Sequence, residues 1–221
     1  MESMYETIMH LPLFKGFTSE QVSDFLEKNK LEFANYASGE TLLSDTDFVD
    51  RVGFVLSGEL NVTTELQKGG IRIARHFGPC FWLMPEYLFG FSTCPHTHVE
   101  TLGKTGMLWF GKEQFLTILD ENYLCKLNYL NYLCYQAQSR YQIANALTEG
   151  STFERWLTIL LMSSIERRAS DISIHASKQQ LIKILKISES ALQEDIVRLT
   201  RLKKIRYTNG VITVLNRREF Y

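Results

Sequence analysis

Cysteine is scarce in this chain of 221 residues, and its few copies form no recognisable pattern. The four cysteines stand at positions 80, 94, 125 and 134, and no two of them form a CxxC pair. This spacing excludes a zinc ribbon, a dithiol redox motif and a small disulfide framework. We therefore expect ordinary reduced thiols, as in a protein of the cytosol.

Long hydrophobic runs and targeting signals are also absent. No apolar run approaches the roughly 20 residues that a membrane helix needs. The first residues, MESMYETIMHLPLF, contain no basic segment and no small-residue cleavage site, so no secretory signal is expected. The sequence has no phosphate-binding loop and no recognisable Ser/His/Asp or Cys/His arrangement. We therefore expect a cytoplasmic protein that is not an enzyme, has no cofactor and does not associate with a membrane.

The charges are distributed unevenly along the chain. Residues 1–152 contain 11 Lys and Arg against 18 Asp and Glu, a net charge of −7. Residues 153–221 contain 13 Lys and Arg against 7 Asp and Glu, a net charge of +6. A basic C-terminal part is typical of a domain that binds a polyanion such as nucleic acid, provided that its fold is suitable.

The N-terminal half changes from a helical to a strand-like pattern near residue 31. Thr18 or Ser19 is suited to begin a helix, and Glu20 and Gln21 suit its first turn. From about 31 to 110, short alternating or β-branched runs are separated by Gly, Asp and Asn. This spacing predicts an antiparallel barrel or sandwich. The clearest runs are YASGETLL, RVGFVLSGELNVTTEL, GGIRIARHF, HTHVETL and GMLWF.

A long helix is predicted over residues 123–148, which contain no Pro or Gly. Its apolar positions alternate spacings of four and three, which is a heptad seam. Such a seam packs against another helix of the same chain or against a second copy, and a helix between two domains favours the second copy. The seam predicts a homodimer through Tyr123, Leu127, Leu130, Cys134, Ala137, Tyr141, Ala144 and Thr148.

The C-terminal part begins after Gly150 with a series of helix and turn signals. Ser151 and Glu154 form a predicted capping box, and Ser177 and Gln180 form another. Ser188 is suited to cap the helix that follows, and DISIH at 171–175 is a predicted strand. Asn209-Gly210 is the preferred pair for a two-residue hairpin turn. Helix, turn, helix and hairpin in this order predict a winged helix-turn-helix.

The whole chain resembles the Crp/Fnr family of bacterial transcription regulators. Gly39-Glu40 stands at the family's entry turn, and residues 54–59, FVLSGE, look like its strand and tight turn. The resemblance implies an α+β protein with an N-terminal antiparallel β-barrel of the double-stranded β-helix or jelly-roll type. It implies a cyclic-nucleotide-binding-like sensor domain over residues 1–122, a dimerisation helix and hinge over 123–150, and a winged helix-turn-helix DNA-binding domain over 151–221.

The family's cyclic-nucleotide cassette is altered in this chain. Trp82-Leu83 stands about where the family has a Gly-Glu pair, and Thr97-His98 about where it has an Arg-Ser pair. No arginine occurs between Arg75 and Arg140, so a bound phosphate would lack its cation. Two interpretations remain: a core plugged by aromatic side chains, or a pocket for an unknown small apolar or planar ligand. The candidate pocket residues are Trp82, Leu83, Glu86, which could replace the family's glutamate, Thr97 and His98.

Metal binding is not expected. Cys94, His96 and His98 alternate along one apparent strand and could share a face, but a fourth ligand is missing and Pro95 favours a loop or edge. The family's iron–sulfur members carry cysteines near the N-terminus, whereas this chain has none before Cys80.

The predicted recognition helix carries acids where family members often carry arginine. The resemblance assigns base reading to Glu189, Ser190, Gln193 and Glu194. It assigns phosphate contacts to Ser177, Lys178, Gln179, Arg198, Arg201 and Lys203. Glutamate accepts from cytosine and glutamine reads adenine, so an acidic face is compatible with specificity if basic flanks provide affinity. We therefore predict a dimeric regulator that binds double-stranded DNA, the alternative being a dimeric protein-interaction regulator with little DNA affinity.

Overall fold

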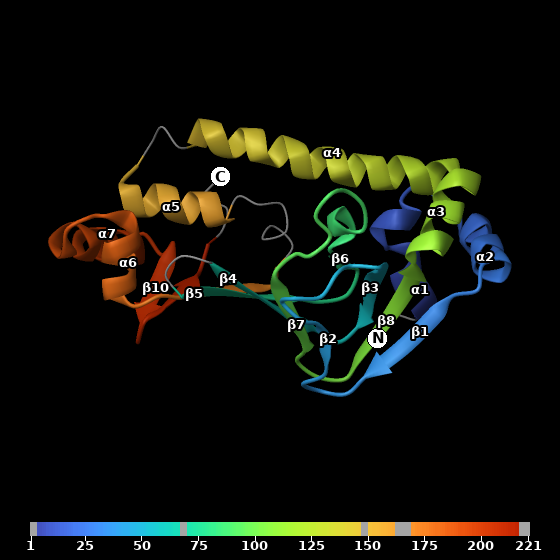
Figure 1. Cartoon of the computed structure of the whole chain (residues 1–221), viewed down its shortest axis with the longest axis horizontal. Coiled ribbons are helices and arrows are strands. Elements are labelled where there is room, and N and C mark those ends of the chain that lie inside the picture. Colours follow the sequence, from blue (N-terminus) through green and yellow to red (C-terminus); the bar gives the residue numbers. More distant parts are fainter. Residues whose placement is uncertain (1–3, 67–69, 147–149, 162–168, 217–221) are drawn as a thin grey trace. The chain divides into compact units, whose positions relative to one another are not determined.

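The computed structural model describes residues 4–66, 70–146, 150–161 and 169–216, with the side chains of 139–146 left aside (Figure 1). The chain divides into two compact units. Unit 1 contains residues 1–62 and 77–134, and unit 2 contains residues 63–76 and 135–221. Residues 63–76, which sequence reasoning placed in the sensor domain, thus group with the C-terminal residues.

Unit 1 combines short helices with two groups of antiparallel strands. The predicted N-terminal cap is confirmed, because Thr18 Oγ1 accepts a hydrogen bond from the Gln21 N–H and the Gln21 side chain returns one to Thr18. The helices are α1 (Met4–Met9), η1 (Pro12–Phe14), α2 (Ser19–Lys28), η2 (Pro85–Tyr87), α3 (Lys112–Glu121) and the first half of α4 (Tyr123–Ala146).

The strands of unit 1 confirm the predicted antiparallel pattern but not a closed barrel. One sheet has the order β1 (Glu32–Tyr36), β8 (Thr105–Gly111), β3 (Arg51–Ser57) and β6 (Trp82–Leu83). A second group contains β2 (Thr41–Leu43), β7 (Thr97–Thr101) and the start of β4 (Leu60–Leu66). Within the described residues, β1 and β6 remain the edges of the first sheet, and a barrel closes only when edge strands pair with each other.

The FVLSGE motif forms the tight turn between β3 and β4. Gly58 has a φ of 81°, and a Cβ there would lie 2.3 Å from the Lys104 carbonyl oxygen. Only glycine has both the conformational freedom and the absent side chain that this turn needs.

Aromatic side chains fill the core of unit 1. Phe14, Phe54, Phe110 and Phe115 are fully buried, and α4 packs its Tyr129 against them. The same side of α4 buries Cys125 and Tyr132. No helix among the described residues is both long and apolar enough to cross a membrane.

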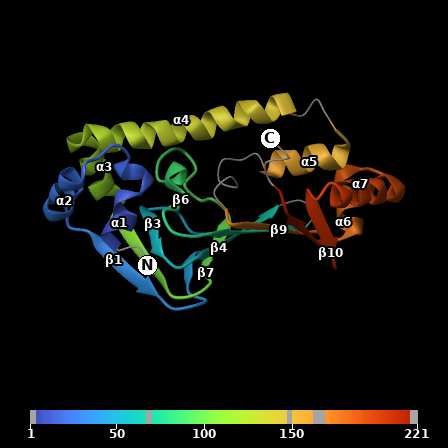
Figure 2. The same cartoon turned by 180° about the vertical axis from the view of Figure 1, so that it is seen from behind.

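Among the described residues, unit 2 combines the second half of α4 and three shorter helices with an antiparallel sheet (Figures 1 and 2). The sheet order is β10 (Ile205–Thr208), β11 (Val211–Val214), β9 (Asp171–His175), β5 (Ile71–Phe77) and the end of β4. The shorter helices are α5 (Thr152–Leu161), α6 (Lys178–Leu185) and α7 (Glu189–Arg201). The predicted Asn-Gly turn is confirmed, because Asn209 and Gly210 both have positive φ between paired Thr208 and Val211.

Candidate nucleic-acid interface

Helices α6 and α7 are held by local signals that the sequence predicts. Ser177 caps α6 through a reciprocal capping box with Gln180, and Ser188 caps α7 by accepting from the Ala191 N–H. Between them, Lys186 ends α6 in the left-handed conformation, with φ 53° and ψ 42°. A lysine at a position that favours glycine carries backbone strain.

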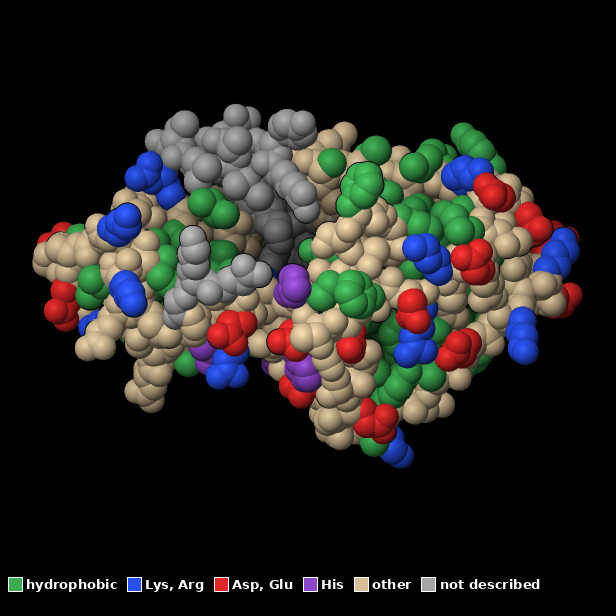
Figure 3. All heavy atoms as spheres, in the orientation of Figure 1, with side chains coloured by type: hydrophobic (Ala, Val, Ile, Leu, Met, Phe, Trp, Pro, Cys, Tyr) green, Lys and Arg blue, Asp and Glu red, His purple; other side chains and the backbone are tan. Residues whose placement is uncertain are grey.

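Helix α7 packs one face into the core of unit 2 and leaves its opposite face exposed to solvent. Leu192, Ile196 and Leu199 are buried in unit 2, as the helical period predicts. All four residues assigned to base reading are therefore exposed: Glu189, Ser190, Gln193 and Glu194. Figure 3 shows several Lys and Arg side chains over the end of unit 2 that carries α6 and α7.

The predicted phosphate-contact residues differ in their surroundings. Ser177, Gln179, Arg201 and Lys203 are exposed. Lys178 is half-buried, and its Nζ donates to Gln193 Oε1 at 2.6 Å. One predicted phosphate contact thus orients one predicted base reader across the two helices.

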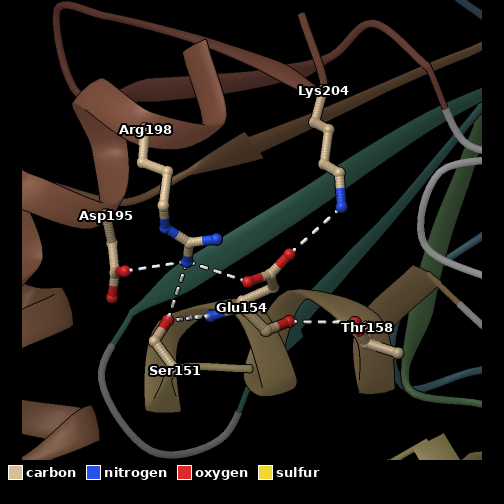
Figure 4. A network of polar contacts seen from close by, with 6 residues as sticks. All are labelled: Ser151, Glu154, Thr158, Asp195, Arg198 and Lys204. Atoms are coloured by element: carbon tan, nitrogen blue, oxygen red, sulfur yellow. Dashed lines mark hydrogen bonds and ion pairs between the residues drawn. The ribbon is translucent and has the colours of Figure 1, made fainter. Parts of the chain in front are cut away.

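Arg198, also predicted to contact phosphate, is instead surrounded by acids (Figure 4). Its Nη2 lies 2.8 Å from Glu154 Oε2 and 3.0 Å from Asp195 Oδ1. Lys204 Nζ lies 3.1 Å from the other oxygen of Glu154. Ser151 keeps its predicted capping role by accepting from the Glu154 N–H at 3.1 Å, while the Glu154 carboxylate is directed to Arg198 and Lys204.

The electrostatics of this cluster follow from its geometry. Burial alone would raise the pKa of Glu154, but hydrogen bonds from Arg198 and Lys204 outweigh burial and lower it. Hydrogen bonds to Asp195 and then Glu154 raise the pKa of Arg198. Both groups are therefore charged near neutral pH, and the cluster joins α5, α7 and Lys204, the residue just before β10.

Sequence reasoning identified Glu154 only as a capping residue. Its ion pairs connect residues 44 and 50 positions apart in the chain. No local motif encodes such a separation, although an acid near the start of α5 and basic residues in the last turn of α7 and just after it were a weak signal for it.

The candidate effector segment lies in unit 1 and is largely packed. Trp82 is fully buried, and its ring centroid lies 4.9 Å from that of Phe54 and 5.1 Å from that of Tyr132. Its indole N–H has no hydrogen-bond partner in the part of the chain that the structure describes. Leu83 is also buried. Trp82 and Leu83 therefore both belong to the hydrophobic core of unit 1.

The loop after Trp82 is fastened to α4. Glu86 in η2 accepts from the Tyr132 hydroxyl at 3.4 Å, and the Pro85 carbonyl accepts from the Tyr129 hydroxyl at 3.1 Å. Burial, with a smaller contribution from the nearby Glu86 charge, raises the pKa of Tyr129 to about 12. Tyr129 is thus a neutral hydrogen-bond donor, and three of the candidate pocket residues meet α4 or the core.

The remaining pocket candidates lie in the other group of strands. Thr97 is buried in β7 and donates to the Pro95 carbonyl. His98 is half-buried, with Nε2 3.7 Å from Glu100 Oε2. Cys94 and His96 meet each other at 3.5 Å. The described residues contain no group of three His, Cys, Asp or Glu that could hold a metal ion.

The heptad seam of α4 lies on the face away from the core of unit 1. Leu130 is 51% exposed, and Leu127, Cys134 and Ala137 are exposed as well. Tyr141 lies within α4, but its side chain is outside the described residues. A row of exposed apolar side chains on a long helix is an unusual feature for an isolated chain.

Comparisons with known proteins identify the fold. The structure is similar to the crystal structure of the catabolite activator protein of Thermus thermophilus, at 17% identity over 95% of this chain and 96% of that chain, with a TM-score of 0.55. It is also similar to the sensor domain of the transcriptional regulator DNR from Pseudomonas aeruginosa, at 13% identity over 62% of this chain and 90% of that domain, with a TM-score of 0.51. At such identities the likeness establishes the fold alone. The sequence matches no protein-family model and no curated protein.

Proposed function

We propose that this protein is a dimeric transcription regulator of the Crp/Fnr type that binds duplex DNA. The observation that carries the proposal is the exposed polar face of α7, held by capped helices α6 and α7 and followed by the hairpin β10–β11. This arrangement supports a winged helix-turn-helix, in which the second helix would enter the major groove.

Affinity would come from the edges of the interface. The residues over 153–221 carry a net charge of +6, whereas α7 itself presents acids. Arg198 is engaged by two carboxylates, so the proposed phosphate contacts are Ser177, Lys178, Gln179, Arg201 and Lys203. Base reading is proposed for Glu189, Ser190, Gln193 and Glu194.

Dimerisation is proposed through the exposed seam of α4, with the two helices parallel. The proposed dimer would bind two half-sites about one helical turn of DNA apart. Trp82 is packed among aromatic side chains, and no arginine occurs between Arg75 and Arg140 to pair with a phosphate. We therefore propose that cyclic nucleotides are not the effector.

The test is selection from random duplex DNA, followed by binding measurements over a range of salt concentrations. Arg201→Ala should weaken binding to every sequence and lower the salt slope by about 1 per protomer. Glu194→Ala should relax specificity at one base pair, at about 1–3 kcal/mol, if Glu194 accepts from a cytosine. A uniform tightening on all sequences would instead identify Glu194 as a repulsive surface acid.

A second candidate function is a dimeric protein-interaction regulator with little DNA affinity. The acidic exposed face of α7 favours it, because acids repel phosphates. No enriched DNA sequence for the wild type, together with no effect of Arg201→Ala, would exclude DNA binding and leave this alternative.

A further inference from the structure

The end of β4 from Thr63 and strand β5 up to His76 belong to unit 2. Strand β5 pairs with β9 over five residue pairs, from Arg72 opposite His175 to His76 opposite Asp171. At one end, the Ser170 N–H donates to the His76 carbonyl at 2.7 Å. At the other end, Gln180 Nε2 donates to the Gly70 carbonyl at 3.3 Å. Strand β5 is thus fastened along its length.

The inner face of β5 belongs to the hydrophobic core of unit 2. Ile71 and Ile73 are buried, and Ile73 lies directly opposite Ile174, which is also buried. Arg75 on the same face is buried and donates to Thr64 Oγ1 at 3.0 Å. Without β5, strand β9 would be an open edge beside exposed isoleucines. The pairing therefore completes the unit rather than resting on its surface.

The outer face of β5 brings a cation to the end of the sheet where DNA would bind. Directly opposite residues of an antiparallel pair point to the same face, so Arg72 and His175 stand side by side, and both are exposed. Val211 lies opposite His175, and Thr208 lies opposite Val211. This row of cross-strand neighbours therefore runs from Arg72 to Thr208, next to the Asn-Gly turn. The Ala176 N–H donates to the Gly210 carbonyl at 2.8 Å.

This row therefore lies beside the first turn of α6. His175 is two residues before Ser177, the α6 cap, and Gln180 of the same capping box holds Gly70. The Arg72 side chain has no hydrogen-bond or ion-pair partner within the described part of the chain. The nearest acid on β9, Asp171, is at the opposite end of the strand, about 13 Å from His175 at the usual strand rise.

We propose that strand β5 forms part of the DNA-contacting surface, with Arg72 as a phosphate contact beside the N-terminus of α6. The inference rests on the proposed DNA-binding function and extends it to a segment outside the winged helix-turn-helix. An unpaired guanidinium suits a phosphate because its planar fork donates two parallel hydrogen bonds. The contact would make a strand that sequence reasoning placed in the sensor domain part of the DNA-binding surface.

The experiment is a salt titration of duplex binding by full-length Arg72→Ala, measured by fluorescence anisotropy on a selected duplex and a random one. Loss of one phosphate contact should lower the salt slope by about 1 per protomer and weaken binding about eightfold per protomer, hence about 60-fold for the proposed dimer, at about 0.1 M salt. Both duplexes should be affected alike. Arg72→Lys should keep most of the slope, because it keeps the charge.

Two controls separate this role from others. Lys104→Ala removes an exposed cation of unit 1 and should leave binding unchanged. Thermal unfolding should be the same for Arg72→Ala and wild type, since the side chain is exposed. Unchanged affinity for Arg72→Ala, while Arg201→Ala binds weakly, would overturn the inference and leave the proposed function standing. If Arg72→Ala and Arg72→Lys lost DNA affinity equally and Arg72→Ala had a lowered unfolding midpoint, Arg72 would have a structural role. This result would also overturn the inference. Absence of DNA binding by the wild type would overturn both.

Discussion

Glu154 and Arg198 form a 2.8 Å ion pair that joins the first turn of α5 to the last turns of α7 (Figure 4). Lys204 completes the pairing by contacting the second oxygen of the same carboxylate. The Glu154 side chain is only 15% exposed, whereas that of Arg198 is 44% exposed. The cluster therefore orients the helix that carries the proposed base-reading residues.

Replacing Glu154 by glutamine should destabilise the fold by about 1 kcal/mol near neutral pH, because Arg198 is partly solvated and its pairing is screened. Folding lowers the pKa of Glu154 below its ordinary value of 4.5, so this stabilisation is present above that value. It is lost as the pH falls through the lowered pKa. Measured by denaturant unfolding, the free energy of unfolding should fall less between pH 7 and pH 3 in Glu154→Gln than in wild type.

The matched control is Glu189→Gln, whose exposed side chain lies on the outer face of α7. This variant should follow the wild-type pH profile. Parallel profiles for Glu154→Gln and wild type would show that the ion pairs do not contribute to stability.

Lys186→Gly should stabilise the protein by about 0.5–1 kcal/mol, because glycine adopts the left-handed conformation of this turn without strain. Lys186→Ala should give no such gain, since alanine has a Cβ and prefers negative φ. Both variants remove the same charge, so their DNA affinities should match while their urea midpoints differ. Equal midpoints would contradict the strain argument.

Leu130→Glu should convert the proposed dimer into monomers, because a charge in the seam would be buried without a partner. Analytical ultracentrifugation measures the change. Leu116→Glu on α3 is the matched control, since Leu116 is an exposed leucine outside the seam, and it should sediment as the wild type does. A dimeric Leu130→Glu would show that the seam is not the interface.

Cys134 should form an intermolecular disulfide under mild oxidation, because equivalent heptad positions face each other in a parallel dimer. Cys134→Ser should abolish the covalent dimer on a non-reducing gel. Cys125 offers an internal control: burial raises the pKa of its thiol to about 12, so it should not react. Crosslinking that persists in Cys134→Ser would rule out this arrangement.

Cyclic AMP and cyclic GMP should produce no binding heat in calorimetry with the wild type. The buried Trp82 side chain fills this part of the core, and it cannot provide the positive charge that a cyclic phosphate needs. Micromolar affinity for either nucleotide would refute this prediction.

Trp82→Ala should destabilise the fold by about 3–5 kcal/mol through the cavity it leaves. Free indole should raise the unfolding midpoint of this variant but not that of wild type, since apolar cavities of this kind bind small aromatic molecules. Indole stabilising both proteins equally would show that it binds elsewhere.

Local structure could be predicted from the sequence because its determinants lie within a few residues of one another. The caps at Thr18, Ser177 and Ser188 need only an oxygen and a nearby N–H, and the Asn209-Gly210 turn needs only two residues that tolerate positive φ. The buried face of α7 likewise follows from a period of 3.6 residues. The positions proposed for DNA contact could be placed on an exposed surface for the same reason.

The remaining features depend on residues far apart in the chain. The ion pair of Glu154 with Arg198 and the pairing of β5 with β9 each join segments whose separation no local period encodes. The structure confirms the predicted antiparallel strands without a closed barrel among the described residues, because alternation shows which face of a strand is buried but not which strand lies beside it. Sequence thus determined the elements and their faces, whereas the tertiary structure decided their partners, since pairing reflects the packing of the whole chain.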